Sequence, residues 1–506
     1  MLGRKRPWLL IAFLASTTCS PYLPPTTVPQ QAPDPALQPF KAALQAYIDQ
    51  TQPYRKEAAQ AQEKTPGKAA PNPTSEASVR VRQNVLADAL ATKLRPNAKQ
   101  GELFVAPAAA AIRRDLAQAF AGLRHDLLMD ALAEQNDTGR ASNPAPPVIN
   151  QHAEAPRVPP VIQELLPPLP KQLEYAFQGR ALLIRDVDAQ VAVDYLPDAL
   201  PEQPPAGVPA VAAPPPGIQM PPVLVPSRRG ALIFAMIGDS GSGDLPQEQV
   251  AQAMLTYFSA GRRFPFVLML GDNLYDDDYT GEFLTPYKPL LDRGVRFRAA
   301  LGNHDRSLEI HFKPFNMDDR DYYSFDEGNA RFVALNSNHP RDPAQLTFLD
   351  NAFNDAGTKW RICFFHHPLY SSGQHAEESR DVIRPALEPA LVRNRVNIVF
   401  SGHEHLYERV APQQGVRYFE SGGGGRKLYD FRASDFDEVG ISQHHFMVVE
   451  IDGDRLLFEA ITPQQKLLDC GILFRTADAQ KKALDADTLR FLAACESTRP
   501  RTTDHD

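Results

Sequence analysis

Four short apolar runs in the second half of the chain have the length and composition of buried β-strands. They lie at residues 232–237, 266–270, 362–365 and 396–400, and polar side chains follow each of them closely. Short runs rich in aliphatic and aromatic residues favour strands over helices. We therefore expect a sheet-containing core whose loops leave from the ends of these strands.

Helical patterns lie between the predicted strands. Val250 and Met254 share the spacing of one helix face, and Asp342-Pro343 is a typical helix start. Residues 382–391 predict a further helix before the run at 396–400. Alternating strands and helices are typical of a layered α/β fold.

Two later apolar runs predict a β-hairpin. Residues 446–451 and 456–460 are separated by Asp452-Gly453-Asp454-Arg455, a sequence typical of a tight turn.

The first 228 residues have a different pattern. Of the chain's 47 prolines, 34 lie before residue 230, concentrated at 21–39, 144–170 and 197–226. Such runs favour extended, semi-rigid linkers. Between them the sequence predicts a small helical module and a short β element that docks onto the rest of the chain. The helical sets are Phe40, Leu44, Tyr47 and Ile48; Leu86, Leu90 and Leu94; and Leu116, Phe120, Leu123 and Leu127; the β element comprises 175–177, 182–184 and 191–195.

Length and charge limit the kind of protein this is. At 506 residues the chain is too long for one typical domain, and 43% hydrophobic content supplies a sizeable core. The formal net charge of -8 is spread along the sequence, with no basic cluster after residue 6. Because nucleic-acid binding depends on such a cluster, we expect a small-molecule partner and no nucleic acid.

The amino terminus resembles an export signal. Basic residues at 4–6 precede the apolar stretch 8–15, which is far shorter than the ~20 residues of a membrane-spanning helix. Cys19 resembles a bacterial lipoprotein cleavage site, although Thr18 departs from the usual Gly, Ala or Ser. We expect a signal at 1–19 and a periplasmic or envelope location, either with lipid on Cys19 or after an ordinary secretory signal.

Cysteine usage agrees with an oxidising compartment. Apart from Cys19, Cys363 lies in a predicted buried strand, and Cys470 and Cys495 lie near the carboxyl terminus. We predict a disulfide between Cys470 and Cys495 that ties a C-terminal helix to the last strand.

Five polar segments in the second half carry side chains that bind metal ions. Asp239 and Asp272 each end a predicted strand, so both carboxylates are expected in one crevice, where one of them can bridge two ions. Oxygen donors suit hard cations and imidazole suits borderline ones. The pattern predicts a two-metal hydrolase. The segments are Gly238-Asp239-Ser240-Gly241, Gly271-Asp272-Asn273-Leu274-Tyr275, Gly302-Asn303-His304-Asp305, His366-His367-Pro368 and Gly402-His403-Glu404-His405.

Local geometry adds two expectations for these segments. His403 and His405 are expected to point the same way along an extended stretch, because side chains alternate there. The glycines before Asp239, Asp272, Asn303 and His403 are expected to allow left-handed turns at the strand ends.

Together these segments resemble the calcineurin-like metallophosphoesterases, and specifically the purple acid phosphatases. Tyr275 narrows the resemblance, because Gly-Asp-x-x-Tyr is that subgroup's pattern. The resemblance covers roughly residues 230–475 and implies a four-layer α/β/β/α sandwich with two central mixed sheets, with the hairpin in the second sheet. It also implies Fe(III) held by Asp239, Tyr275 and His405, divalent Fe, Zn or Mn held by Asn303, His366 and His403, and Asp272 as the bridge.

The resemblance implies a reaction as well. His304 and His375 match the family's substrate-contacting and proton-donating histidines, whereas Ala376 stands where plant-type members have a further histidine. The expected activity is that of an acid phosphatase, in which a metal-bridging hydroxide attacks a phosphomonoester and one of these histidines protonates the departing alkoxide.

Other interpretations stay open from the sequence. One is a phosphodiesterase or nucleotide phosphatase on the same scaffold, and another is an envelope interaction protein with a structural metal domain. His367 is expected to pack or to support the site, and the acidic run 276–278 to be an exposed loop or to repel highly anionic substrates. The remaining histidines are expected to be structural or solvated: His311, His339, His444 and His445. The predicted organisation is a signal at 1–19, a proline-rich region at 20–228, a catalytic domain at 229–475, and a C-terminal helix and tail at 476–506.

Overall fold

The computed structural model describes most of the chain after residue 33. The described residues are 34–63, 76–121, 128, 146–200, 230–481 and 484–498, apart from 154, 156, 164, 355, 356 and 358. The predicted signal, Cys19, Leu123 and Leu127 therefore lie outside the described residues. Within the described ranges, no helix combines the length and apolar content that a membrane crossing requires.

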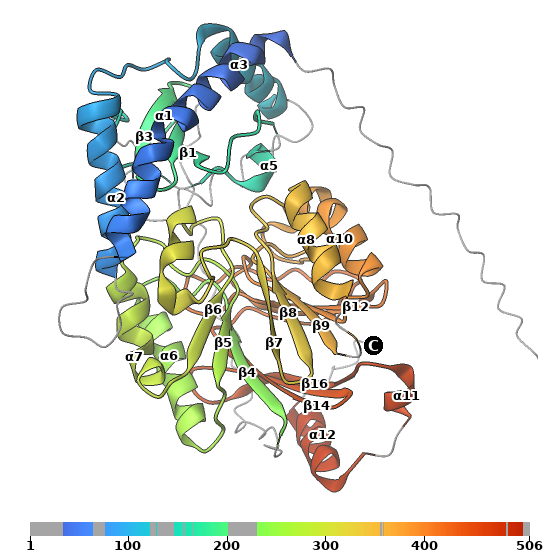
Figure 1. The fold of residues 1–506 in the computed structure, drawn as a ribbon. Coiled ribbons are helices and arrows are strands. Elements are labelled where there is room, and N and C mark those ends of the chain that lie inside the picture. The colour runs from blue at the N-terminus through green and yellow to red at the C-terminus, as the bar shows by residue number, and fades with distance from the viewer. Residues whose placement is uncertain are drawn as a thin grey trace, which may run out of the picture.

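Two mixed β-sheets packed face to face form the centre of the molecule (Figure 1). The first has the strand order β16 (Leu467–Phe474), β15 (Arg455–Ile461), β14 (Phe446–Asp452), β4 (Leu232–Ile237), β5 (Phe266–Met269) and β6 (Arg296–Ala299). The second has the order β13 (Asp437–Ile441), β11 (Tyr407–Gln413), β12 (Val416–Ser421), β10 (Ile398–Ser401), β9 (Trp360–Phe364), β8 (Ala330–Ala334) and β7 (Tyr323–Glu327). The four strands predicted from apolar runs are therefore confirmed.

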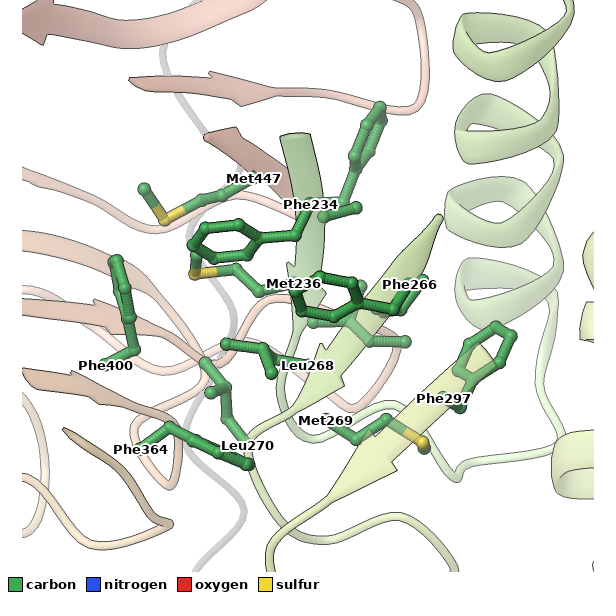
Figure 2. Close-up of a cluster of buried hydrophobic side chains, with 14 of the residues drawn as sticks. Phe234, Met236, Phe266, Leu268, Met269, Leu270, Phe297, Phe364, Phe400 and Met447 are labelled. Atoms are coloured by element: carbon green, nitrogen blue, oxygen red, sulfur yellow. The ribbon is translucent and has the colours of Figure 1, made fainter. Parts of the chain in front are cut away.

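Aromatic side chains fill the space between the two sheets. The ring of Phe234 in β4 lies 5.4 Å from Phe266, 5.2 Å from Phe332 and 6.3 Å from Phe400, measured between ring centroids. Figure 2 shows this cluster, with Phe400 reaching toward the strands that carry Phe234 and Leu268. Burial of this apolar surface between the sheets is the main force that holds them together.

Helices cover both outer faces, as the predicted sandwich requires. The first sheet is covered by α6 (Leu245–Ser259) and α7 (Thr285–Leu291), and the second by α8 (Pro343–Asn354) and α10 (Arg384–Arg393) (Figure 1). Alternate strand residues supply the two sides, since Phe332 faces the other sheet while Val333 belongs to the apolar cluster under α8. The chain therefore has the expected four-layer α/β/β/α architecture. Shorter helical segments are η3 (Tyr279–Leu284), η4 (Ser307–His311), η5 (Lys313–Phe315), α9 (Ala376–Glu378) and η6 (Ser379–Ile383).

The predicted hairpin forms, but its expected position was wrong. Strands β14 and β15 pair in antiparallel register from Phe446↔Ile461 to Asp452↔Arg455. β14 also pairs with β4, with Met447 opposite Met236. The hairpin thus extends the sheet that contains Asp239's strand, where it satisfies backbone groups that would otherwise form an open edge.

The N-terminal domain, which we define as the described part of residues 34–200, combines three long helices with a small sheet. The helices α1 (Gln38–Glu63), α2 (Glu76–Ala89) and α3 (Ala106–Phe120) pack on an antiparallel sheet of β1 (Leu173–Gln178), β2 (Ala181–Asp186) and β3 (Val191–Leu196). Phe40, Leu116, Tyr175 and Ile184 belong to one apolar cluster. The predicted β element and the helices are confirmed as far as the described residues go, since Leu123 and Leu127 of the third helical set lie outside them, and these elements share a core.

One proline-rich run is not a linker. Within 144–170, Val158 and Ile162 are buried, and α5 (Pro160–Gln163) begins with a proline, which suits the first turn of a helix. Arg157 pairs through its backbone with Ala176 of β1. The apolar residues between the prolines therefore anchor this segment in the core of the N-terminal domain.

The carboxyl-terminal segment is fastened to the first sheet. Its helices are α11 (Ala477–Gln480) and α12 (Ala486–Thr498), and the predicted disulfide joins Cys470 of β16 to Cys495 of α12. Phe491 packs with Leu457 in the same small cluster. Cys363 is a buried free thiol, as expected for its strand.

Candidate metal centre

The predicted metal-binding side chains come together where strands of both sheets end. Asp239, Asp272 and Asn303 follow β4, β5 and β6 of the first sheet, whereas His366 and His403 follow β9 and β10 of the second. In the first sheet β4, β5 and β6 run parallel, and in the second sheet β9 and β10 run parallel. Within each sheet, the carboxyl ends of these strands therefore lie at the same edge. The site is therefore built across the sandwich and uses both sheets.

Asp239, Tyr275 and His405 form the first donor group. His405 Nε2 lies 3.3 Å from the Tyr275 hydroxyl and 3.5 Å from Asp239 Oδ1. All three side chains are buried, with Tyr275 only 5% exposed. This is the set that the resemblance assigns to the trivalent ion.

Asn303, His366 and His403 form the second donor group. His366 Nε2 lies 2.8 Å from Asn303 Oδ1 and 3.2 Å from His403 Nδ1. The side chain of His367 also lies close, since the ligand atoms of His366, His367 and His403 are all within 4.8 Å of one another. His367 Nδ1 contacts Ser337 Oγ at 2.8 Å, which fits the supporting role expected for it.

Asp272 lies between the two groups. Its Oδ1 is 3.4 Å from His366 Nε2, and ligand atoms of Asp239, Asp272 and His405 lie within 4.8 Å of one another. Its Oδ2 is buried and makes no hydrogen bond within the described part of the chain. A buried carboxylate oxygen without a hydrogen bond, facing imidazole, phenol and amide donors, is what a bridging metal ligand would show. The residues present therefore fit a pair of metal ions.

Hydrogen bonds on the far side of two imidazoles orient them toward the centre. His366 Nδ1 lies 3.0 Å from the Leu270 carbonyl oxygen, and His405 Nδ1 lies 2.6 Å from the Lys427 carbonyl oxygen. A ring nitrogen that faces a carbonyl carries a proton, so Nε2 is the atom that each ring, in its neutral form, offers to a metal. Metal-binding histidines are held in this way.

The backbone at the strand ends differs from our expectation. The left-handed φ falls on the ligand residues themselves, with 56° at Asp239, 51° at Asp272 and 74° at His403. His403 and His405 therefore do not lie on an extended segment. Their loop turns at His403, which sends the two imidazoles to different donor groups.

The glycines before the ligands mainly allow close approach. Of the four, only Gly271 has a positive φ, of 93°. A Cβ atom on Gly302 would lie 2.0 Å from Asp272 Oδ1, so a side chain there would displace the bridging carboxylate.

The electrostatics of the centre favour cations. Burial would lower the pKa of His366, but Asp272 and Asp239 raise it to about 10, which reports a strongly negative potential. Burial and the same carboxylates raise the pKa of Tyr275 well above its ordinary value. Burial and the surrounding histidines lower the pKa of His403, which keeps its imidazole neutral and able to bind a metal.

The two histidines predicted to act in catalysis lie on either side of the donor groups. The His304 ring packs against that of Tyr275 in a tilted arrangement, with ring centroids 4.6 Å apart, and its Nε2 is 3.9 Å from Asp272 Oδ2. His375 lies 4.5 Å from His403, also between ring centroids. Both rings therefore border the centre, as their predicted roles require.

Glu404 is a residue that the sequence analysis missed. Its carboxylate accepts the backbone N–H groups of Gln374, at 2.8 Å, and of His375, and its Oε1 lies 3.5 Å from His375 Nδ1. It therefore holds the loop that carries His375. Its place between the two ligand histidines of one segment was the available signal.

Arg426 and Tyr429 were also missed. The Arg426 guanidinium lies 4.5 Å above the centre of the Tyr275 ring, and Tyr429 stacks on His405 with ring centroids 4.0 Å apart. Arg426 is partly exposed and directly follows the glycine run 422–425. It places a positive charge beside the candidate centre.

The other histidines are structural, as expected, and the acidic run is not simply an exposed loop. His445 is buried and contacts Ser421 Oγ at 2.9 Å, and His311 Nδ1 contacts Asp319 at 2.8 Å. His339 contacts Gln163 at 2.8 Å, and His444 Nδ1 lies 3.3 Å from the Gly423 carbonyl oxygen. Within the acidic run, Asp277 forms an ion pair with Arg306.

Comparison with known proteins adds to this geometry. Residues 233–407, which contain both donor groups, match the family model described as calcineurin-like phosphoesterase. This part of the chain is similar to calcineurin-like phosphoesterases, and we call it the phosphoesterase domain. The match begins in β4 and ends at Tyr407, so the hairpin, β16 and the N-terminal domain lie outside it.

Curated relatives of the phosphoesterase domain are purple acid phosphatases. Purple acid phosphatase 5 of Arabidopsis thaliana is 27% identical over 220 residues, which cover 39% of this chain and 51% of the relative. Purple acid phosphatase 4 of the same organism is 25% identical over 244 residues, covering 40% of this chain and 71% of the relative. This chain thus spans about half the length of the first of these proteins.

A solved structure of a purple acid phosphatase from yellow lupin seeds is also similar to the chain. It aligns with 67% of this chain and 64% of its own, at 16% identity and a TM-score of 0.42.

Proposed function

We propose that the protein is an exported, binuclear metal-dependent phosphomonoesterase of the acid phosphatase type. One observation carries the proposal: carboxylate, phenol, amide and imidazole donors from both sheets converge on Asp272, with His366 Nε2 at 3.4 Å from its Oδ1. The phosphoesterase domain and the named relatives support the same reaction class.

Asp239, Tyr275 and His405 would hold Fe(III), and Asn303, His366 and His403 would hold divalent Fe, Zn or Mn, with Asp272 between them. When bound, two such ions supply positive charge for a phosphate group and lower the pKa of water. Side chains of this protein would bind the phosphate and transfer the proton. His304 and Arg426 would contact the phosphate, and His375 or His304 would give a proton to the leaving alkoxide.

We also propose a cellular location. The segment 1–19 would direct export, and a lipid would be attached to Cys19. The Cys470–Cys495 disulfide supports an oxidising compartment, because such bonds are rare in reducing ones. Mass spectrometry of the mature amino terminus, purified from the envelope fraction, tests this. An unmodified residue other than Cys19 at that terminus would refute the lipid.

The first experiment is metal analysis of purified full-length protein together with assays on para-nitrophenyl phosphate, its bis ester and nucleotides. We expect two metal ions per chain and a preference for the monoester. Preference for the bis ester or a nucleotide would replace the proposed substrate class. Metal-loaded protein without activity on any of these over a broad pH range would refute the enzyme function.

Asn303→Ala tests the residue assignment. The variant should lose turnover and one metal ion per chain, because it removes an oxygen donor 2.8 Å from His366 Nε2. The matched control is Asn329→Ala, in the turn between β7 and β8, where the side chain donates to the Gly453 carbonyl oxygen at 2.7 Å. Normal metal content and turnover in Asn303→Ala would show that Asn303 is not a ligand.

A further inference from the structure

The N-terminal domain meets the phosphoesterase domain through a buried network of charged side chains. Glu174 Oε1 accepts a hydrogen bond from Arg185 at 2.8 Å, and Glu174 Oε2 accepts one from Arg157 at 2.8 Å. These three side chains are at most 7% exposed. Ser307, from the other domain, donates to Glu174 Oε2 at 2.8 Å and accepts from Arg157. These hydrogen bonds pair the buried charges at the interface. The pairing matters because an unpaired charge at this depth would cost folding free energy.

Arg306, next to Ser307, joins three separate segments. Its Nη1 donates to Gln190 Oε1 of the N-terminal domain at 3.3 Å, and its other terminal nitrogen pairs with Asp277. Its backbone N–H donates to Glu309 Oε1 at 2.7 Å. Arg306 is 6% exposed and Gln190 is 2% exposed, so their contact is shielded from solvent, whereas the Asp277 side chain is 26% exposed.

The positions of these partners connect the interface to the candidate metal centre. Arg306 follows Asn303 by three residues and His304 by two, and Asp277 follows Tyr275 by two. One guanidinium therefore ties the loop of Tyr275 to the loop of Asn303 and His304, and Gln190 ties both to the N-terminal domain.

A second set of contacts supports the same loop. Gln163 of α5 contacts His339 at 2.8 Å, and Asn338, the neighbour of His339, donates to the Gly302 carbonyl oxygen at 2.9 Å. The N-terminal domain thus reaches the loop from both sides of Asn303.

We propose that the N-terminal domain positions the candidate centre, with Arg306 as the positioning residue and Gln190 as its anchor. The domain fixes the loop that presents Asn303 and His304 relative to Tyr275, and it makes no contact with substrate itself. The proposal deepens the function proposed above and rests on it for its kinetic readout. Displacements of a catalytic group by about 1 Å can cost on the order of 100-fold in rate, so such positioning matters.

The test compares full-length variants Arg306→Met and Gln190→Ala with wild type. Both should lower kcat on para-nitrophenyl phosphate by roughly 10-fold or more with a smaller change in KM, because the catalytic groups are present but misplaced. Hydrogen exchange of residues 302–312 should become faster in both variants. Arg306→Lys, which keeps the charge opposite Asp277, should recover part of the kcat.

The matched control is Arg95→Met. The side chain of Arg95 is 9% exposed, close to the 7% of Arg306, and it pairs with Glu102 inside the N-terminal domain. At a temperature where every variant is folded, this control should keep kcat and exchange in 302–312 close to wild type.

Three results decide the matter. Unchanged kcat and exchange in Arg306→Met and Gln190→Ala would overturn the proposal, as would an equal effect in Arg95→Met, since the effect would then reflect stability alone. If wild type hydrolyses no phosphate ester, the proposed enzyme function is refuted, but the positioning proposal is not. Exchange in residues 302–312 would still show whether Gln190 and Arg306 hold the loop.

Discussion

Tyr275 is the residue that distinguishes this centre from a site of carboxylates and histidines alone. Its hydroxyl lies 3.3 Å from His405 Nε2, and burial together with Asp272 and Asp239 raises its pKa well above the ordinary value. The raised pKa means that ionising the phenol costs free energy. A phenolate at this position therefore needs a strong Lewis acid to stabilise it.

Replacing Tyr275 with Phe should therefore remove colour. Tyrosinate bound to Fe(III) absorbs visible light, so wild type should be purple or pink, and Tyr275→Phe should lose the band. A visible spectrum with iron analysis measures this. The control is Tyr323→Phe, a buried tyrosine that donates to the Ala299 carbonyl oxygen at 2.8 Å and should keep the colour. Colour that persists in Tyr275→Phe would exclude Tyr275 as the ligand.

Arg426 gives a second prediction at the residue scale. Its guanidinium lies 4.5 Å over the Tyr275 ring at the border of the centre. A charge-assisted hydrogen bond to phosphate contributes about 1.5–3 kcal/mol, so Arg426→Met should raise KM for a phosphomonoester by roughly 10-fold or more. Steady-state kinetics measure this, with the exposed Arg432→Met as control. Equal KM values in the two variants would assign Arg426 a packing role.

At the scale of elements, helix α12 depends on its covalent attachment. It carries Cys495, which is bonded to Cys470 of β16 across 25 residues of sequence, and it packs on Leu457 through Phe491. The helix covers only a small apolar cluster of its own, so packing alone holds it weakly.

Loss of this disulfide should destabilise the carboxyl-terminal segment. A closed loop of this length is worth about 3 kcal/mol in the chain-entropy model, so Cys470→Ser with Cys495→Ser should unfold at lower urea concentration. Reductant should destabilise wild type and leave the double variant unchanged. Cys363→Ser does not remove a crosslink, so reductant should still act on it. An identical urea midpoint in wild type and double variant would contradict the prediction.

At the scale of the whole molecule, the interface between the two domains should depend on pH. Burial would raise the pKa of Glu174, but Arg185 and Arg157 lower it from 4.5 to about 2. Because the folded pKa is the lower one, the carboxylate stabilises the fold fully above pH 4.5. That stabilisation is lost as pH falls toward 2.

Glu174→Gln tests this dependence. The variant should be less stable than wild type at neutral pH, because Arg157 and Arg185 lose their charged partner. Its stability should also fall less steeply between pH 4.5 and 2 than that of wild type. Thermal unfolding over this range measures both. Parallel curves for the two proteins would mean that Glu174 does not carry the acid dependence.

Much of the architecture could be predicted from short-range patterns. The apolar runs gave β4, β5, β9 and β10, and the turn at 452–455 gave the hairpin, because strand formation and tight turns are encoded by neighbouring residues. The hairpin's sheet could not be predicted this way. Pairing of β14 with β4 joins residues about two hundred positions apart, and only the competition among all strands decides it.

The sequence by itself determined the chemistry of the candidate centre. The ligand types, their order and Tyr275 are local features, and the structure brings Asp239, Asp272 and their partners together. The sequence also determined which cysteines could pair. The ligands depend on which side chains follow the strand ends, and the disulfide depends on where cysteines occur; both are given by the order of residues.

Only the tertiary structure decided how the centre is supported. Glu404 reaches back to His375, Arg426 lies over Tyr275, and Arg306 joins Asp277 to Gln190. The position of Glu404 between two ligand histidines was the one local signal, and even there the sequence did not show the partner. The contacts themselves depend on the packing of two sheets and of a second domain. Buried polar groups are stable only when a distant partner satisfies them, so their roles become visible only once the chain is folded.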